Sequence, residues 1–186
     1  MTRKRAAMAG LAAGLALSFV AGQVEAQQAP AAPAPAGPPV LMSAEWAAQA
    51  CEAWNKDKVL TEDLEKGGWI KNDKGRGYKA LHIYRTNCPN DPRVELKIQS
   101  KDKKAICTAG GATTVTPDTS VDYIMHAETY RWEQMGKGEY GPMRAMMFGR
   151  LKFDGPKWEA MNNMGPFENF LKLVGKVPSD MKKCNK

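Results

Sequence analysis

Few residues of this chain have types and spacing that could support chemistry. Its 186 residues include two histidines and four cysteines, at positions 51, 88, 107 and 184. No two cysteines form a CxxC pair, which argues against haem attachment, a zinc ribbon or a thioredoxin-type motif. His82 and His126 lie in no recognisable catalytic pattern, and nucleophile-elbow, zinc-protease and P-loop motifs are missing from the sequence. The sequence therefore predicts no catalysis, no cofactor and no metal site of these kinds.

The glycines at 136, 138 and 141 match the dinucleotide pattern GxGxxG. That pattern binds a pyrophosphate only where a strand precedes the glycines and a helix follows them. A helical pattern precedes Gly136 here, so we expect a flexible loop between two helices.

Methionine is unusually frequent between positions 125 and 164. Met143, Met146 and Met147 share helical spacing, as do Met161 and Met164, and thioethers in such an arrangement could bind Cu(I). We favour the interpretation that these side chains fill an adaptable apolar interior. The reason is that they alternate with other apolar residues, namely Phe148, Leu151, Phe153, Phe167 and Phe170.

The N-terminus has the features of a secretory signal peptide. Three basic residues at 3–5 precede an uncharged stretch at 6–22 that is rich in Ala, Leu and Gly, and Val24-Glu25-Ala26 fits a cleavage site. A membrane anchor is the weaker reading because the apolar run is short. We expect residues 1–26 to be removed and the protein to be periplasmic.

Residues 27–42 contain five prolines and five alanines and no charge. This composition predicts a stiff, extended tether, so the folded domain is expected at 43–186.

The whole chain carries a net charge of +7. A basic loop at 66–79 (Lys66, Lys71, Lys74, Arg76 and Lys79) is by default a solvated face, with transient contact with a membrane surface as an option. An exported protein rarely meets nucleic acid, so none is expected as a partner.

The hydrophobic periodicity predicts an α+β domain with a five-stranded, mostly antiparallel sheet and helices on one face. Ser43 should cap a first helix that runs to about Lys58, with an apolar stripe that includes Cys51 and Trp54. Strands are expected at 78–84, 94–98, 104–109, 121–126 and 149–153. Further helices are expected at 127–135, from Pro142, from Pro156 and through 167–174.

An even number of cysteines in an oxidising compartment favours disulfides. Cys88 follows one expected strand and Cys107 lies on a nearby one, so we predict Cys88–Cys107. Cys51–Cys184 would then fix the C-terminal tail to the first helix. The alternative is that Cys51 is a buried free thiol and Cys184 is exposed.

The stretch from Val121 to Val174 resembles the sterol carrier protein type 2 domain, also called the non-specific lipid-transfer domain. The resemblance rests on the order of several weak motifs rather than on any single one. They are Asp122–Met125, Thr129–Met135, Gly136–Gly138, Pro142–Phe148, Gly149–Gly155 and Trp158–Met161.

This resemblance implies that the sheet and helices enclose an apolar tunnel for a lipid. The side chains expected around it are Tyr123, Met125, Met143, Met146, Met147, Phe148, Leu151, Phe153, Met161, Met164, Phe167 and Leu171. The helices at 156–174 would form a lid, with Gly165-Pro166 as its hinge.

The function expected from the resemblance is periplasmic binding and shuttling of a hydrophobic lipid without catalysis. The ligand would be a phospholipid, a fatty acid, a sterol or hopanoid, or a polyprenyl compound. Two alternatives stay open: an envelope adaptor that keeps the fold but fills its core, and a methionine-rich copper-binding protein.

Overall fold

The computed structural model describes residues 37–185. The predicted signal peptide and the tether as far as residue 36 lie outside this range. At its other end, the predicted tether belongs to the fold: Val40 pairs with Asp180, and Leu41 and Met42 are buried in the core. The folded part therefore begins before Ser43, because two apolar side chains follow the prolines and pack inside.

The first helix forms as its capping residue and apolar stripe predict. α1 (Ala44–Lys56) begins after Ser43, whose side chain accepts a hydrogen bond from the Trp46 N–H. Trp46, Cys51 and Trp54 lie on its buried face. A π-helical turn, η1 (Val59–Asp63), then leads into α2 (Leu64–Lys66) and the 3₁₀ turn η2 (Trp69–Lys71).

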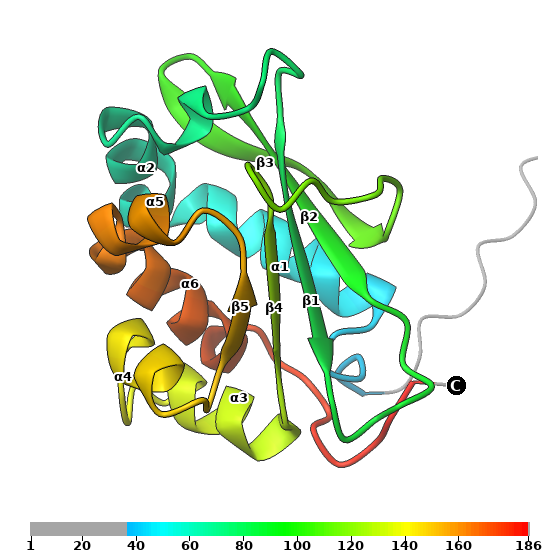
Figure 1. Cartoon of the computed structure of the whole chain (residues 1–186). Coiled ribbons are helices and arrows are strands. Elements are labelled where there is room, and N and C mark those ends of the chain that lie inside the picture. The colour runs from blue at the N-terminus through cyan, green and yellow to red at the C-terminus, as the bar shows by residue number, and fades with distance from the viewer. Residues whose placement is uncertain (1–36, 186) are drawn as a thin grey trace, which may run out of the picture. The chain divides into compact units, whose positions relative to one another are not determined.

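One five-stranded sheet forms the centre of the molecule (Figure 1). Its strands are β1 (Lys79–Arg85), β2 (Val94–Lys101), β3 (Lys104–Ala112), β4 (Tyr123–Ala127) and β5 (Lys152–Asp154), in the order β3-β2-β1-β4-β5. The β1–β4 pair is parallel and the other three pairs are antiparallel. Parallel neighbours need a crossover, which residues 113–122 provide by passing in front of the sheet in this view. The predicted fold class is confirmed.

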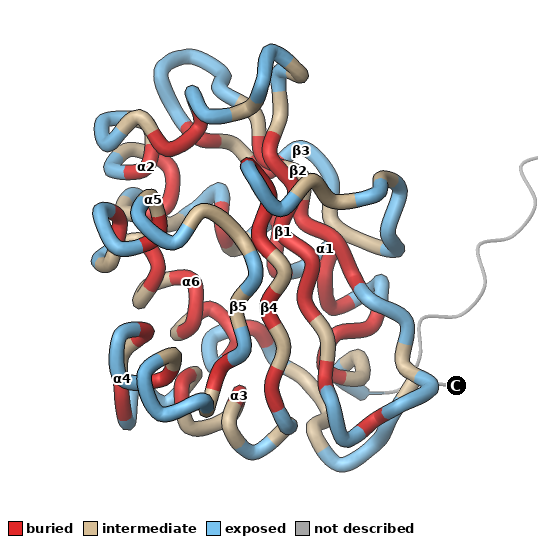
Figure 2. Tube along the Cα trace, in the orientation of Figure 1, coloured by how far each residue is buried: buried red, intermediate tan, exposed pale blue. Residues whose placement is uncertain are grey.

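The remaining helices are α3 (Thr129–Gly136), α4 (Pro142–Met147), α5 (Lys157–Asn162) and α6 (Met164–Lys176). α1 passes behind the strands, whereas α3, α4 and α5 pack against α6 (Figure 1). Alternate strand residues such as Leu81, Leu96 and Met125 point into the core, and the buried segments run through the centre of the molecule (Figure 2). Among residues 37–185, no helix combines the length and apolarity needed to span a membrane.

The loop with the GxGxxG pattern joins α3 to α4, and its first glycine has a packing role. A Cβ on Gly175 would lie 2.4 Å from the carbonyl oxygen of Gly136. Gly136 thus allows the close contact between α3 and α6, and a helix precedes the glycines as expected.

All four cysteines form disulfides, but the predicted pairing is wrong. The bonds are Cys51–Cys107 and Cys88–Cys184, with Cα–Cα distances of 5.3 and 5.6 Å. Cys107 lies opposite Ile98, which lies opposite Lys79 at the start of β1, whereas Cys88 follows the other end of β1. Seven residues of strand span roughly 20 Å, and a disulfide needs Cα atoms within about 7 Å.

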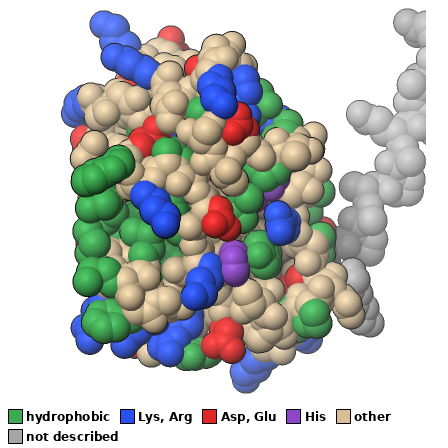
Figure 3. All heavy atoms as spheres, in the orientation of Figure 1, with side chains coloured by type: hydrophobic (Ala, Val, Ile, Leu, Met, Phe, Trp, Pro, Cys, Tyr) green, Lys and Arg blue, Asp and Glu red, His purple; other side chains and the backbone are tan. Residues whose placement is uncertain are grey.

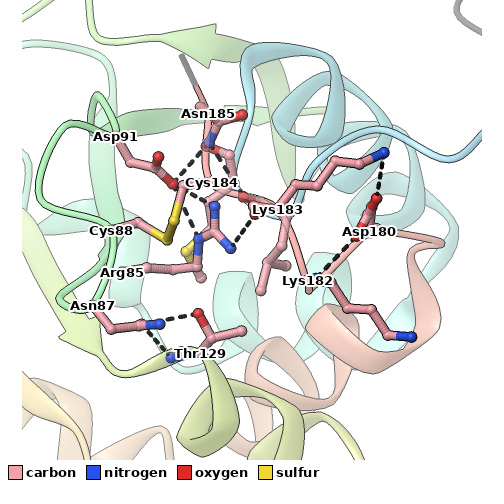
Figure 4. The surroundings of a disulfide bond; sticks show 12 residues. Arg85, Asn87, Cys88, Asp91, Thr129, Asp180, Lys182, Lys183, Cys184 and Asn185 are labelled. Atoms are coloured by element: carbon pink, nitrogen blue, oxygen red, sulfur yellow. Dashed lines mark hydrogen bonds and ion pairs between the residues drawn. A yellow bond between two sulfur atoms is a disulfide. The ribbon is translucent and has the colours of Figure 1, made fainter.

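Each disulfide sits beside hydrogen bonds that fix the same two segments. α1 lies against β3, where the Asn55 side chain accepts from the Cys107 N–H at 2.8 Å and donates to its carbonyl at 2.8 Å. At the other disulfide, the buried Arg85 guanidinium is paired with Asp91 and donates to the Lys183 carbonyl at 2.9 Å (Figure 4). The C-terminal tail is thus held by a covalent bond and by hydrogen bonds to both members of the buried Arg85–Asp91 ion pair.

Candidate functional site

The space between the sheet and the helices is almost filled. The cavity there has a volume of about 20 Å³. Its lining is aromatic and aliphatic and includes Trp54, Trp69, Leu81, Tyr123, Phe167 and Phe170. A volume of about 10–15 Å³ by this measure holds one water molecule, so a hydrocarbon chain does not fit. The predicted apolar tunnel is therefore not seen, because the tryptophan, tyrosine and phenylalanine rings pack against one another there.

Three polar side chains meet beside this small cavity. Lys79 is completely buried and forms an ion pair with Glu159 of α5, and the Tyr123 hydroxyl donates to Glu159 Oε1 at 2.9 Å. The Lys79 ammonium also lies 4.3 Å from the centre of the Trp69 ring. Burial lowers the pKa of Lys79, although its pairing with Glu159 opposes that shift, and burial beside the Glu159 carboxylate raises the pKa of the Tyr123 hydroxyl.

This cluster was not expected from the sequence, in which Lys79 belongs to a basic loop. Its members bond to one another, so the arrangement fastens α5 to the sheet. Two other cations of the loop are also paired with carboxylates. Arg76 makes two hydrogen bonds to the buried Asp122, at 2.9 and 2.6 Å, and Lys74 pairs with Asp118. Burial disfavours a charged Asp122, but the hydrogen bonds from Arg76 and from backbone N–H groups outweigh it and lower its pKa.

An open apolar groove lies on the surface between α4, β5 and α5. Its volume is about 370 Å³. We call it the methionine groove; its lining is Met143, Met146, Met147, Leu151, Phe153 and Met161, completed by Gly149, Lys152 and Lys157. Apolar side chains gather on this side of the molecule, at the left of Figure 3. Met147 is 73% exposed, and Met143 and Met161 are 41% and 42% exposed.

Short elements and a tight turn make this groove. Pro142 starts α4, where its missing N–H costs no hydrogen bond, and the helix ends after fewer than two turns at Met147. Gly149 then adopts a φ of 65°, which favours glycine, and the chain reverses into β5. Because β5 has only three residues, it leaves the side chains of α4 and α5 uncovered next to it.

The twelve residues predicted around a tunnel divide between the interior and the groove. Tyr123, Met125 and Phe167 line the small internal cavity, and Leu171 is buried in the core. Six line the methionine groove, namely Met143, Met146, Met147, Leu151, Phe153 and Met161. Met164 packs against the core, and Phe148 lies outside the groove with 67% of its surface exposed. The structure thus does not bring the twelve together at one place.

A second surface cavity of about 340 Å³ adjoins the groove, and sequence reasoning missed it. We call it the basic pocket. Gly149 and Lys152 line both cavities. The other residues of the basic pocket come from the ends of β1 and β4, from the start of α3 and from the turn before β5. They are Thr86, His126, Ala127, Glu128, Tyr130, Arg131, Phe148 and Arg150.

The half-buried His126 ring lines this pocket and packs beside β1. The ring stacks on Tyr84 with centroids 4.6 Å apart, and Nδ1 is shielded from solvent with no hydrogen-bond partner among residues 37–185. Burial lowers the pKa of His126. Asp154 opposes that shift, and Arg93 and Lys152 add to it.

Comparison with known proteins gives structural likeness alone. No family model and no curated protein matches the sequence. The crystal structure of a sterol carrier protein 2 matches 74% of this chain and 98% of its own length, at 18% identity and a TM-score of 0.49. A conserved hypothetical protein of Thermus thermophilus matches 78% of this chain and 96% of its own, at 17% identity and a TM-score of 0.46.

A third solved structure is that of the sterol carrier protein domain 2 of Helicoverpa armigera. It matches 72% of this chain and 94% of its own length, at 19% identity and a TM-score of 0.34. The identities of these matches lie below one fifth, so the likeness concerns the fold and does not extend to what these proteins bind. The descriptions of two of these structures name sterol carrier proteins, the family whose motif order the sequence resembles.

Proposed function

We propose that this protein binds a hydrophobic lipid and shuttles it in the periplasm without transforming it. The observation that supports the proposal is the methionine groove, an apolar hollow of about 370 Å³ that is open to solvent. Sites for small molecules are usually concave, mostly apolar and about 300–1,000 Å³ in volume. The groove has that size and that chemistry, whereas the interior has room for about one water molecule.

The methionines suit a ligand whose shape varies. Met143, Met147 and Met161 have flexible thioether side chains that remain partly exposed, so they can close over a hydrocarbon chain at little cost in strain. Burying each CH₂ group of the ligand contributes about 0.8 kcal/mol. An open groove covers only part of the chain, and the side chains must become ordered, so we expect micromolar rather than nanomolar dissociation constants.

Export to the periplasm is part of the proposal. Its support is the basic and apolar pattern of residues 1–26 together with two disulfides among the described residues. Structural disulfides persist in oxidising compartments and are rare in a reducing cytosol. Transient contact with a membrane surface would let the groove load and unload its lipid.

A second candidate is an adaptor whose filled interior serves only stability. The small internal cavity favours it, because this fold can be complete without a bound molecule. A third is copper binding, which the four methionine side chains of one groove favour. Native mass spectrometry of the gently purified protein separates the three. Bound lipid supports our proposal, and either copper or an empty protein contradicts it.

A binding assay localises the site. A fluorescent twelve-carbon fatty acid is titrated against the wild type, a Met143→Ser/Met161→Ser variant and a Trp158→Ser control. Trp158 is 77% exposed on α5 but does not line the groove. We expect the double variant to bind at least about tenfold more weakly, because two apolar contacts are lost, and the control to bind as the wild type does. Equal affinity in all three proteins would contradict the proposal.

A further inference from the structure

The basic pocket holds more positive than negative charge. Arg131, Arg150 and Lys152 line it, and Glu128 is the one carboxylate in its lining. None of the three cations has a carboxylate within 4.0 Å among residues 37–185. In the loop at 66–79, by contrast, Lys74, Arg76 and Lys79 are all paired with carboxylates. Arg131 donates one hydrogen bond to Gln134 Oε1 at 3.0 Å, whereas the side chains of Arg150 and Lys152 have no hydrogen-bond or ion-pair partner among residues 37–185.

Aromatic stacking orients two of these cations. The Arg150 guanidinium lies 4.6 Å from the centre of the Tyr140 ring and 5.7 Å from that of Phe148, and Arg131 lies 4.4 Å from that of Tyr130. A guanidinium that stacks by its face keeps its N–H donors directed outward in its plane, which suits a phosphate or a carboxylate. His126 adds a ring nitrogen, Nδ1, that is shielded from solvent and lacks a partner within the described chain.

The pocket and the methionine groove meet at the turn that leads into β5. Gly149 and Lys152 line both cavities, so one wall separates an apolar hollow from a cationic one. A Cβ on Gly149 would lie 3.3 Å from Lys152 Nζ, which places this ammonium directly over the turn. A molecule that fits both cavities has a hydrocarbon chain and, next to it, an anionic group.

We propose that the ligand is an anionic amphiphile whose chain lies in the methionine groove and whose phosphate or carboxylate head lies in the basic pocket. Arg150 and Lys152 bind the head, and Arg131 extends the cationic wall from α3. This inference rests on the proposed lipid-binding function and specifies its ligand class. Uncharged lipids of the same chain length fill the groove but leave the pocket empty.

A series of ligands with one twelve-carbon chain tests the inference by isothermal titration calorimetry. The probes are dodecyl phosphate, dodecanoate and dodecan-1-ol, each below its solubility or micelle limit, with inorganic phosphate as a fourth. We expect both anions to bind wild-type protein about tenfold or more tightly than the alcohol, a preference that shrinks as salt is added. We expect inorganic phosphate alone not to displace dodecyl phosphate at equal concentration.

A double variant of the pocket and a control variant outside it test whether the basic pocket causes the preference for anions. In Arg150→Gln/Lys152→Gln, the difference in affinity between the anions and the alcohol, all measured on the variant, should disappear. The control Lys137→Gln removes one exposed cation, at the end of α3, that pairs with Glu133, and it should keep the wild-type preference.

The outcomes separate the two proposals. Equal binding of anions and alcohol to the wild type would overturn this inference and leave lipid binding intact. A preference that survives in the double variant, or displacement by inorganic phosphate alone, would overturn it as well. If none of the three amphiphiles binds, the lipid-binding function itself fails and the inference fails with it.

Discussion

The interior of the protein and the methionine groove are both lined by apolar side chains. These side chains are closely packed in the interior and partly exposed to solvent in the groove. In the interior, the Trp54 ring packs against the rings of Trp69 and Phe170, and the remaining cavity is about 20 Å³. In the groove, about 370 Å³ is open and Met147 is 73% exposed. Burial and ring packing stabilise the first region, whereas the second leaves apolar surface in water. Exposed apolar surface of this kind marks interaction sites.

The two regions also differ in how charge is used. Beside the interior, Lys79, Glu159 and Tyr123 satisfy one another and tie α5 to the sheet. Beside the groove, Arg150 and Lys152 have no carboxylate within 4.0 Å in the described chain. On the proposed function, the first region serves folding and the second binds the ligand. Substitutions should therefore separate the two, with losses of stability on one side and losses of affinity on the other.

The largest expected loss of stability comes from Asp122→Asn. Asp122 is fully buried and accepts hydrogen bonds from Arg76 and from the backbone N–H groups of Ala80 and Asp118. Removing one member of a buried ion pair costs about 3–5 kcal/mol. Urea unfolding at pH 7 measures the decrease in the free energy of unfolding. Asp118→Asn, which alters the exposed pair with Lys74, is the matched control and should lose little.

The unfolding free energy of Asp122→Asn should also depend on pH differently from that of the wild type. The pKa of Asp122 is lowered in the folded protein, so its contribution to stability is present above the ordinary aspartate pKa of about 3.9 and is lost as pH falls below it. The unfolding free energy of the wild type should therefore decrease more steeply below pH 4 than that of Asp122→Asn. Parallel curves would contradict the assignment of this carboxylate.

The same substitution, methionine to alanine, can be made in the interior at Met125 and in the groove at Met143. Its effects on stability and on binding then compare the two regions. Met125 is completely buried on β4, and its truncation should cost about 2–5 kcal/mol of unfolding free energy. Met143 is 41% exposed in the groove, and its truncation should change stability by less than about 0.5 kcal/mol while weakening fatty-acid binding. If Met125→Ala weakened binding more than Met143→Ala at equal folded fraction, the interior would be the ligand site.

Removing the Cys88–Cys184 disulfide tests whether the C-terminal tail contributes to stability and not to binding. The double variant Cys88→Ser/Cys184→Ser opens a link between residues 96 positions apart, and it should lower the unfolding free energy by about 2–4 kcal/mol. Neither Cys88 nor Cys184 lines the groove, so fatty-acid affinity should stay unchanged. Thermal unfolding with a parallel binding titration checks both, and weakened binding would tie the tail to the site.

Gly165→Ala should have the smallest effect. The sequence predicted a hinge at Gly165-Pro166, but these residues lie in the first turn of α6, and the break between α5 and α6 falls at Asn163. A Cβ on Gly165 would meet nothing within 4 Å, so alanine should stabilise by about 0.5–1 kcal/mol. Stopped-flow release of the fluorescent fatty acid tests the hinge. Slower release from Gly165→Ala than from the wild type supports the hinge, and equal release rates contradict it.

Local pattern was enough to predict the elements. The Ser43 cap and the stripe through Cys51 and Trp54 predicted α1, and the alternation from Val94 to Ile98 predicted β2. These features depend on neighbours within one turn or one strand, so the sequence contains them directly. The strand expected at 149–153 forms only over Lys152–Asp154, because Gly149 turns the chain first.

Features that depend on three-dimensional placement could not be predicted in this way. The pairing of Cys51 with Cys107 depends on which end of the sheet each cysteine reaches. A stripe of methionines at helical spacing shows that they share a face but not whether that face meets the sheet or water. The basic pocket combines Arg131 with Arg150 and Lys152, which lie on different elements. Lys79 reads as part of a basic loop, and only the fold places it under α5.

Photo-crosslinking tests the central claim most directly. A twelve-carbon fatty acid with a terminal diazirine is bound to the purified protein, irradiated and mapped by peptide mass spectrometry. We predict labels on the methionine groove, at Met143, Met147 and Met161. Labels on Trp54, Trp69 or Phe170 would place the chain in the interior instead, and labelling spread evenly over the surface would show that the protein has no lipid site; either result contradicts the account.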